Sequence, residues 1–124
     1  QWECVTGRVE QGESFSAAVR REASEELGQA VQVEFIVGTT HFYRGVVGPE
    51  QEMVGIHYGC SVGEVQEIRR SQEHSACQWV TAQEAEGLFP GGHWLRALMV
   101  RAEMMRGLLP EELRQFHRTN GFEV

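Results

Sequence analysis

Three glutamates stand close together in the stretch TGRVEQGESFSAAVRREASEELGQAV, which runs from Thr6 to Val31. If the middle of this stretch is a helix, Glu22, Glu25 and Glu26 fall within an arc of about 100° on its surface. Exposed like charges at three- or four-residue spacing cost a helix ~0.2–0.5 kcal/mol per pair, so helix stability alone does not favour this arrangement. Carboxylates gathered on one face can instead bind hard divalent cations, which prefer oxygen ligands. A solvated face of Glu and Arg side chains is the alternative that the helix alone leaves open.

The residues around the glutamates predict where the helix begins and ends. Ser14 is a suitable N-cap, and Gly28 stands where a left-handed residue would end the helix, so we expect a helix from about Ser14 to Leu27. Next to the acidic face, a stripe of apolar side chains is expected to anchor the helix to a core. These residues are Phe15, Val19, Ala23 and Leu27.

Strand-like and helix-like stretches follow one another along the rest of the chain. Residues 31–44 and 53–62 are rich in β-formers, and apolar residues alternate with others in the second stretch, as in a half-buried strand. Shorter strands are expected at 65–69 and 77–81. Strands mixed with helices indicate an α/β or α+β sandwich, and a length of 124 residues fits a single domain, 1–124.

Three helices are expected in the second half of the chain. Thr81 and Glu84 form a capping box for a short helix that ends near Phe89. A longer helix at about 93–108 carries apolar residues at helical spacing, and Pro110 fits the first turn of a last one.

Composition excludes several classes of protein. Hydrophobic residues make up 41% of the chain and charged residues 23%, which is ordinary for a globular domain. No apolar run approaches the ~20 residues of a membrane span, and the first residues do not show the pattern of a signal peptide. The net charge of −7 argues against a nucleic-acid polymer as partner. The three cysteines lack metal-binding or CxxC spacing, which favours reduced thiols and a cytoplasmic location.

With its surroundings, the acidic stretch closely resembles the signature of the Nudix hydrolase family, GX5EX7REUXEEXGU, where U is a bulky aliphatic residue. All the specific positions of the signature are present. They are Gly7, Glu13, Arg21, Glu22, Glu25, Glu26 and Gly28. Ala23 is a small occupant of the first U position, and Gln29 departs from the last one.

The resemblance implies a Nudix-type α/β/α sandwich around a mixed β-sheet, with one or two family strands before the signature apparently missing here. By matching position, Glu22 and Glu26 would be the principal ligands of Mg2+ or Mn2+, and Glu25 would complete the cluster. The backbone carbonyl of Gly7 often joins them, and Arg21 would hold the carboxylates in orientation. Glu13 would fix the loop to the helix.

A second stretch, EHSACQWVTAQEA from Glu73, matches an element with EH, four residues and W. It resembles dihydroneopterin triphosphate pyrophosphatase and related nucleoside triphosphate pyrophosphohydrolases. The resemblance makes Glu73 the candidate for a further metal ligand or general base, and His74 a candidate for orienting a phosphate or the attacking water. Gln78 stands where some relatives keep their base, so the identity of the base stays open. Trp79 is expected in the core.

The expected activity is Mg2+-dependent hydrolysis of a nucleoside (or pterin) diphosphate linked to a further group X, with a nucleoside triphosphate as the favoured type of substrate. The partner would be a small phosphorylated molecule, and a homodimer is possible because dimers are common in the family. Arg44, Tyr43 and His57 are candidates for lining the substrate pocket, although residues of this kind are more often sheet-surface residues. A nucleotide-sugar or ADP-ribose pyrophosphatase, a nucleotide-binding regulatory module without turnover, and an acidic interaction domain are the alternatives.

Overall fold

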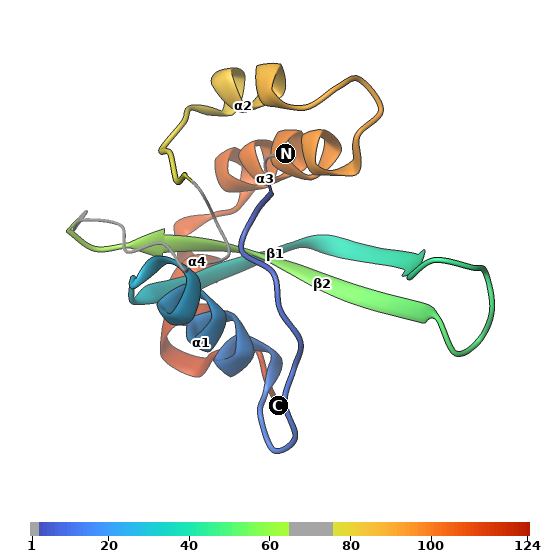
Figure 1. Ribbon diagram of the computed structural model, residues 1–124. Helices are drawn as coiled ribbons and strands as arrows, with labels where there is room; N and C mark the ends of the chain where they lie inside the picture. The colour runs from blue at the N-terminus through green and yellow to red at the C-terminus, as the bar shows by residue number, and fades with distance from the viewer. Residues whose placement is uncertain (1–2, 65–75) are drawn as a thin grey trace.

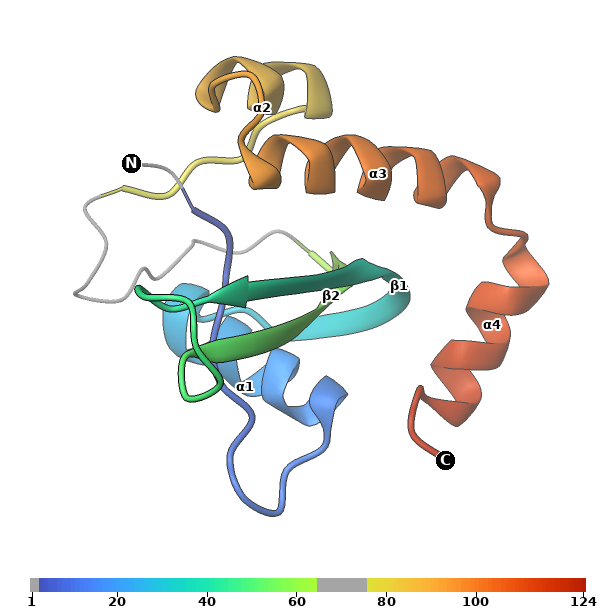
Figure 2. The same ribbon diagram turned by 90° about the vertical axis from the view of Figure 1, so that its right-hand side faces the viewer.

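A long β-hairpin separates the helices into two layers in the computed structural model, which describes residues 3–64 and 76–124 (Figure 1). Helix α3 lies on one side of the hairpin with α2 beyond it, and α1 lies on the other side (Figure 2). Helix α4 packs against β1. The elements in chain order are α1 Phe15–Leu27, β1 Val31–Tyr43, β2 Glu52–Val62, α2 Ala82–Leu88, α3 Trp94–Leu108 and α4 Glu111–Asn120.

Helix α1 begins and ends where its sequence predicts. The Ser14 side chain accepts a hydrogen bond from the backbone N–H of Ala17 at 3.2 Å, which caps the first turn. Gly28 is left-handed with φ 65°, and its N–H donates to the carbonyl of Ser24 at 2.9 Å. The acidic residues therefore share one rigid helix.

The apolar stripe expected to anchor α1 is only partly correct. Phe15 is 51% exposed, so the expectation that it anchors the helix is wrong, whereas Ala23 is buried as expected. The other buried residues of α1 are also small, Ser16 and Ala18. Small side chains let a helix approach its neighbours closely, whereas Val19 and Leu27 of the expected stripe are half-buried. Gln29, which departs from the family's apolar position, is nevertheless buried.

Strands β1 and β2 pair antiparallel from Val31 opposite Val62 to Tyr43 opposite Glu52. The two long strands confirm the prediction for 31–44 and 53–62 to within a residue at the ends. In the described ranges the sheet consists of this pair alone, so no parallel pairing of the expected mixed sheet is seen there. Residues 77–81 form no strand, which corrects that prediction, and residues 65–69 lie outside the described part of the chain.

Strand β1 is irregular at two places, and a side chain from a helix distant in sequence contacts each of them. The register shifts between Val33 and Phe35 and again between Ile36 and Gly38. At the second shift, Nε of Arg101 on α3 donates to the carbonyl of Val37 at 2.7 Å. A bulge leaves backbone groups without a ladder partner, and this contact satisfies one of them while it fixes α3 to the sheet.

The later helices follow their predicted caps. Thr81 and Glu84 form the complete capping box at α2, with bonds of 3.1 and 3.2 Å. Pro110 takes the N-cap position of α4 and does not enter its first turn. Trp79 is 55% exposed, which contradicts the expectation of a core residue. No helix within 3–64 or 76–124 is long and apolar enough to cross a lipid bilayer.

The core lies between β1 and the helices. Among the large side chains of this core, Val33 is the most deeply buried, with 1% of its surface exposed. Phe35 is 7% exposed. Gly59 faces Phe35 across the hairpin, and a Cβ atom at Gly59 would overlap the phenyl ring. The buried apolar residues are Ala18, Ala23, Val33, Phe35, Val37, Ala85, Phe89 and Leu95.

Replacing Gly59 by alanine should therefore destabilise the protein. The new methyl group must displace the buried ring of Phe35, and such overpacking costs about 1–3 kcal/mol. The free energy of unfolding, measured by urea denaturation, should fall by this amount. Gly63→Ala is the matched control, because a Cβ at Gly63 meets no atom within 4 Å. Equal stability of the two variants would contradict the packing described for Phe35.

Candidate active site

The guanidinium of Arg21 is the centre of a charged network on α1. Its Nε donates to Oε2 of Glu13 at 2.8 Å, and its Nη2 donates to Oε1 of the same carboxylate at 3.1 Å. The Nη2 atom also donates to the backbone carbonyl of Arg8 at 2.8 Å. The bidentate pair and the carbonyl contact tie the loop before α1 to the helix, because the guanidinium presents its donors in a fixed plane.

The same guanidinium also holds two of the three predicted metal ligands. Its Nη1 donates to Oε1 of Glu22 at 2.8 Å and to Oε2 of Glu25 at 3.2 Å. The side chain of Glu22 is 17% exposed and that of Glu25 is 59% exposed. Arg21 contacts one oxygen of each of these two carboxylates. The second oxygen of each is not bonded to Arg21.

An extended segment, residues 4–8, runs along the acidic face in the direction opposite to α1. Arg8 contacts Arg21 through its carbonyl, and Gly7 packs so closely on Glu22 that a Cβ at Gly7 would overlap the carboxylate. Further back, Cys4 lies near Glu26. Burial raises the pKa of the Cys4 thiol, and the negative charges of Glu3 and Glu26 raise it further. The backbone of this segment therefore passes directly over the predicted ligands.

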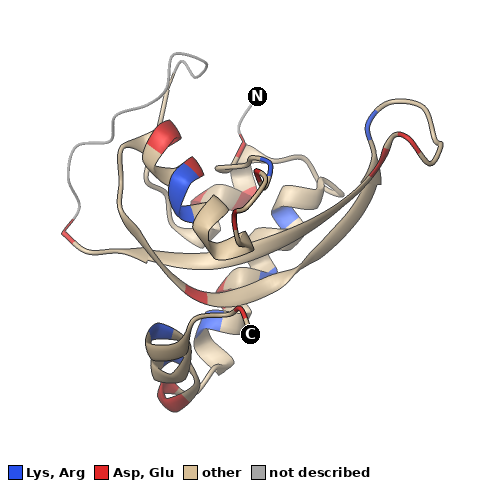
Figure 3. Cartoon of the chain, turned by 90° about the horizontal axis from the view of Figure 1, so that it is seen from below, with Lys and Arg blue, Asp and Glu red and all other residues tan. Residues whose placement is uncertain are grey.

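Both partners of the central ion pair have shifted pKa values. The hydrogen bonds from Arg21 are the main reason that the pKa of Glu13 lies below its ordinary value. Hydrogen bonds to Glu13 and then to Glu22 raise the pKa of the Arg21 guanidinium. The pair of Arg21 and Glu13 is thus charged at neutral pH. Figure 3 shows that basic and acidic positions are neighbours on α1 and in the loop before it.

The donor set on α1 fits a divalent cation in chemistry. All its side-chain donors are carboxylate oxygens, and the close approach of Gly7 brings backbone to Glu22 where any larger residue would fill the space. Within the described ranges, no three acidic, His or Cys side chains already converge on one point. The side chain of Glu25 is exposed, and exposed side chains change rotamer readily, so this carboxylate can turn towards an ion without movement of the helix.

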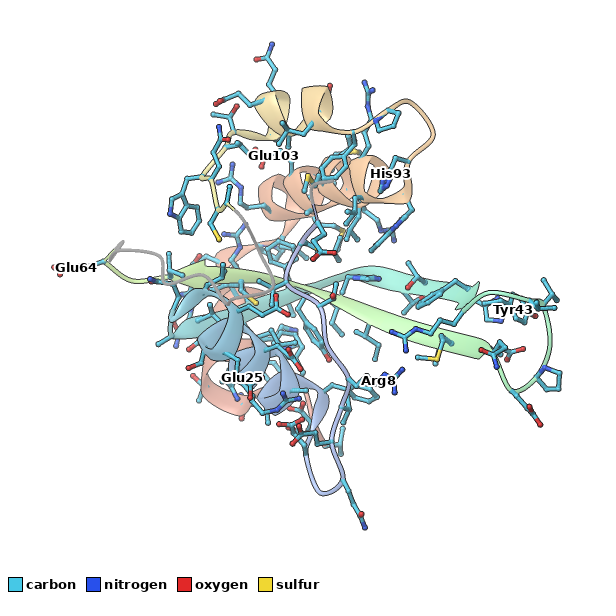
Figure 4. The ribbon with its side chains drawn as sticks, viewed as in Figure 1. Arg8, Glu25, Tyr43, Glu64, His93 and Glu103 are labelled. Carbon is cyan, nitrogen blue, oxygen red and sulfur yellow. The ribbon has the colours of Figure 1, made fainter. Side chains whose placement is uncertain are left out.

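The structure does not bring every predicted residue to this place. The end of the hairpin, with Tyr43 as the last residue of β1 and Arg44 in the turn after it, extends away from α1 (Figure 4). There the N–H of Arg44 donates to the carbonyl of Gln51 at 2.8 Å, and the Arg44 side chain is exposed. Glu73 and His74 lie outside the described residues.

His57 belongs to a separate polar and aromatic group on the α3 side of the sheet. Its Nε2 lies 2.9 Å from the hydroxyl of Thr40, and its ring centroid is 5.5 Å from that of Trp94. Burial lowers the pKa of His57, so the imidazole is neutral at pH 7. Trp94 is 47% exposed. The pairing of Thr40 with His57 depends on strand register, and no local motif could have predicted it.

The comparison with family models agrees with this geometry. Residues 1–102 match the NUDIX domain model, and the chain therefore belongs to the Nudix family. The Nudix domain is found in hydrolases that act on pyrophosphate bonds of small phosphorylated substrates. Nudix enzymes generally use divalent metal ions, usually Mg2+.

One similar curated protein is an octanoyltransferase from Myxococcus xanthus. It is 33% identical to this chain over 79 residues, a match that covers 64% of the chain and 22% of the relative. The chain thus spans about a fifth of the length of that relative.

Replacing Arg21 by glutamine should change how stability depends on pH. Because the folded protein holds the pKa of Glu13 low, this pair contributes stability above the ordinary glutamate pKa of ~4.3 and loses it as the pH falls below that value. The stability difference between wild type and Arg21→Gln should therefore shrink between pH 6 and pH 3.5. Urea unfolding at both pH values measures it.

Arg20→Gln is the control for this experiment, because Arg20 is the exposed neighbour on the same helix and takes no part in the network. Its effect on stability should change less with pH than that of Arg21→Gln. A stability difference for Arg21→Gln that stays constant over the whole range would contradict the role of the pair.

Proposed function

We propose that this protein is an Mg2+-dependent pyrophosphohydrolase that cleaves a phosphoanhydride bond in a nucleoside (or pterin) diphosphate linked to a further group, with a nucleoside triphosphate as the favoured type of substrate. Mn2+ is the expected substitute metal. The observation that carries the proposal is the joint contact of Arg21 with Glu13, Glu22 and Glu25, beneath the backbone of Gly7.

Each part of this network has a role in the proposed site. Glu22 and Glu26 would hold the metal with Glu25, and the carbonyl of Gly7 would join them. When bound, such an ion screens the charge of a diphosphate and lowers the pKa of a bound water. Arg21 keeps the carboxylates oriented and offsets their mutual repulsion. An acidic protein of net charge −7 could in this way accept a polyanion.

The general base is proposed to be Glu73, on the strength of its EH-and-W element. A base must take a proton from water, and the neutral amide of Gln78 cannot do so. His74 would orient a phosphate or the water from the same loop. Glu25 is the alternative base, since it is the more exposed of the two predicted ligands that Arg21 holds.

For the remainder of the substrate, His57 is the candidate on the α3 side of the sheet, opposite to α1. A neutral imidazole held by Thr40 can donate or accept one hydrogen bond, and Trp94 offers an exposed ring beside it. Arg44 is a weaker candidate because it lies in the hairpin turn, away from α1.

Two other functions are compatible with the same carboxylates. A nucleotide-sugar or ADP-ribose pyrophosphatase would use the same metal site with a different pocket. A regulatory module would bind a nucleotide without turnover. The acyl transfer named for the Myxococcus relative is not carried over, because the match covers 22% of that protein.

The proposal is tested by assaying hydrolysis of nucleoside triphosphates, dinucleoside polyphosphates and ADP-ribose under Mg2+, for wild type and Glu26→Gln. A bound metal contributes several kcal/mol to the transition state, so the variant should lose about 100-fold or more in kcat/KM. Glu112→Gln, an equal change of charge on α4, should retain wild-type rates. Turnover of none of the substrates by the wild type would refute the enzyme hypothesis, as would a fully active Glu26→Gln.

Replacing Gly7 by alanine tests the contact between the extended segment and Glu22. The added methyl must push the flexible carboxylate aside, so metal binding should suffer more than folding. We expect the half-activating Mg2+ concentration to rise about tenfold, at the lower end of effects on metal-ligand partners. Gly48→Ala is the control, because a Cβ at Gly48 meets nothing within 4 Å. An unchanged Mg2+ requirement in Gly7→Ala would argue against a site beneath this backbone.

A further inference from the structure

The beginning of α1 is held by a residue from the opposite end of the described chain. The backbone N–H of Ser16 donates to Oε1 of Glu123 at 2.8 Å, and its hydroxyl donates to Oε2 at 2.9 Å. Ser16 is 3% exposed, so both donors are removed from water. Figure 1 shows the end of the chain beside the loop and first turn of α1.

This contact supplies what α1 lacks in its own sequence. The first turn of a helix has backbone N–H groups without partners in the helix, and it favours a nearby negative charge. Ser14 satisfies the N–H of Ala17, but the first turn of α1 contains no acidic residue. Glu123 provides the missing carboxylate, and the two hydrogen bonds from Ser16 lower the pKa of Glu123 so that it is charged at neutral pH.

The residues before Glu123 hold it in place. Gly121 ends α4 with φ 74°, and its N–H donates to the carbonyl of His117. The ring of Phe122 stacks on that of His117, with centroids 4.1 Å apart, and meets the ring of Tyr58 on β2 edge-on. These contacts direct the chain from α4 back towards α1.

Helix α4 is in turn fixed to the sheet. Nε of Arg118 lies 3.0 Å from Oε2 of Glu34, at the first irregularity of β1, and Nη1 of Arg118 pairs with Glu111 at 2.8 Å. Glu34 also accepts a hydrogen bond from Ser61 on β2 at 2.7 Å. A continuous set of contacts thus leads from the sheet through α4 to the start of α1.

We infer that Glu123 is a positioning residue for the metal site, and that it sets the place of the glutamate-bearing helix relative to the backbone of residues 4–8. The inference rests on the proposed function. Ser16 lies six residues before Glu22, or ~9 Å along the helix axis. A shift or rotation of α1 at Ser16 therefore moves Glu22 away from Gly7. Residues 103–124 lie beyond the part of the chain that matches the NUDIX domain.

The experiment compares Glu123→Gln with a variant destabilised elsewhere. Thr81→Ala removes the cap of α2, on the other side of the sheet, and lowers the melting temperature without touching α1. The readouts are Mn2+ affinity, measured by calorimetry without substrate, and the half-activating Mg2+ concentration for hydrolysis. We expect Glu123→Gln to weaken both by about threefold to tenfold, less than the ~10–100-fold for direct partners of ligands. Thr81→Ala should leave both unchanged.

Ser16→Ala provides a second route to the same contact, with a small buried substitution that keeps the backbone. It should weaken Mn2+ binding less than Glu123→Gln does. The double variant should bind Mn2+ no more weakly than Glu123→Gln alone, because both substitutions disrupt the same interaction. Glu123→Asp, with a shorter side chain, should recover part of the affinity.

The outcomes separate this inference from the proposed function. If the wild type binds Mn2+ and hydrolyses nucleotides while Glu123→Gln does so with unchanged metal dependence, the positioning role is overturned and the enzyme remains. Equal weakening in Glu123→Gln and Thr81→Ala would also overturn it, because general loss of stability would then be the cause. A wild type that neither binds Mn2+ nor hydrolyses any substrate would refute both.

Discussion

The compensation of clustered glutamates by Arg21 is the interaction on which the rest of the site depends. Several carboxylates lie within a turn of one another on α1, and their repulsion would favour either protonation or fraying of the helix. Arg21 spreads its donors over Glu13, Glu22 and Glu25 and still reaches the carbonyl of Arg8. A lysine at that position would carry a single ammonium group. It would lack the planar fork of donors with which the guanidinium reaches several carboxylates at once.

Holding the acids requires that α1 itself be held, and the fold does this from both ends. Gly28 ends the helix and turns the chain into β1, whose Val33, Phe35 and Val37 form the buried centre. At the beginning of the helix, Ser14 accepts a hydrogen bond from Ala17, three residues later. Glu123 accepts one from Ser16, which lies 107 residues away along the chain. The orientation of the acidic face is thus a property of the whole domain.

The hairpin lies between the helices and divides the domain into two sides. Its antiparallel strands place α1 on one face and α3 on the other, and the shifts in β1 offer backbone and side-chain partners to Arg101 and Arg118. The acidic network and the group around His57 consequently lie on different sides of the hairpin.

Local patterns predicted much of this structure. The caps of α1 and α2 depend on residues within four positions of one another, and alternation along 53–62 is a property of a single strand, so both were legible in the sequence. The family signature likewise identified the acidic helix before any fold was known, and the match over residues 1–102 agrees with it. The errors concern burial and pairing. Phe15 and Trp79 are apolar yet exposed, and residues 77–81 have strand-like composition without forming a strand.

The sequence by itself determined which residues could act, the limits of the helix that carries them, and the family to which the chain belongs. Tertiary structure alone decided that Gly7 packs on Glu22, that Thr40 meets His57, and that Glu123 reaches Ser16. The physical reason is that caps and periodic patterns arise from neighbours along the chain. Contacts between distant segments arise only when strand register and helix packing bring them together, and no local spacing records that outcome.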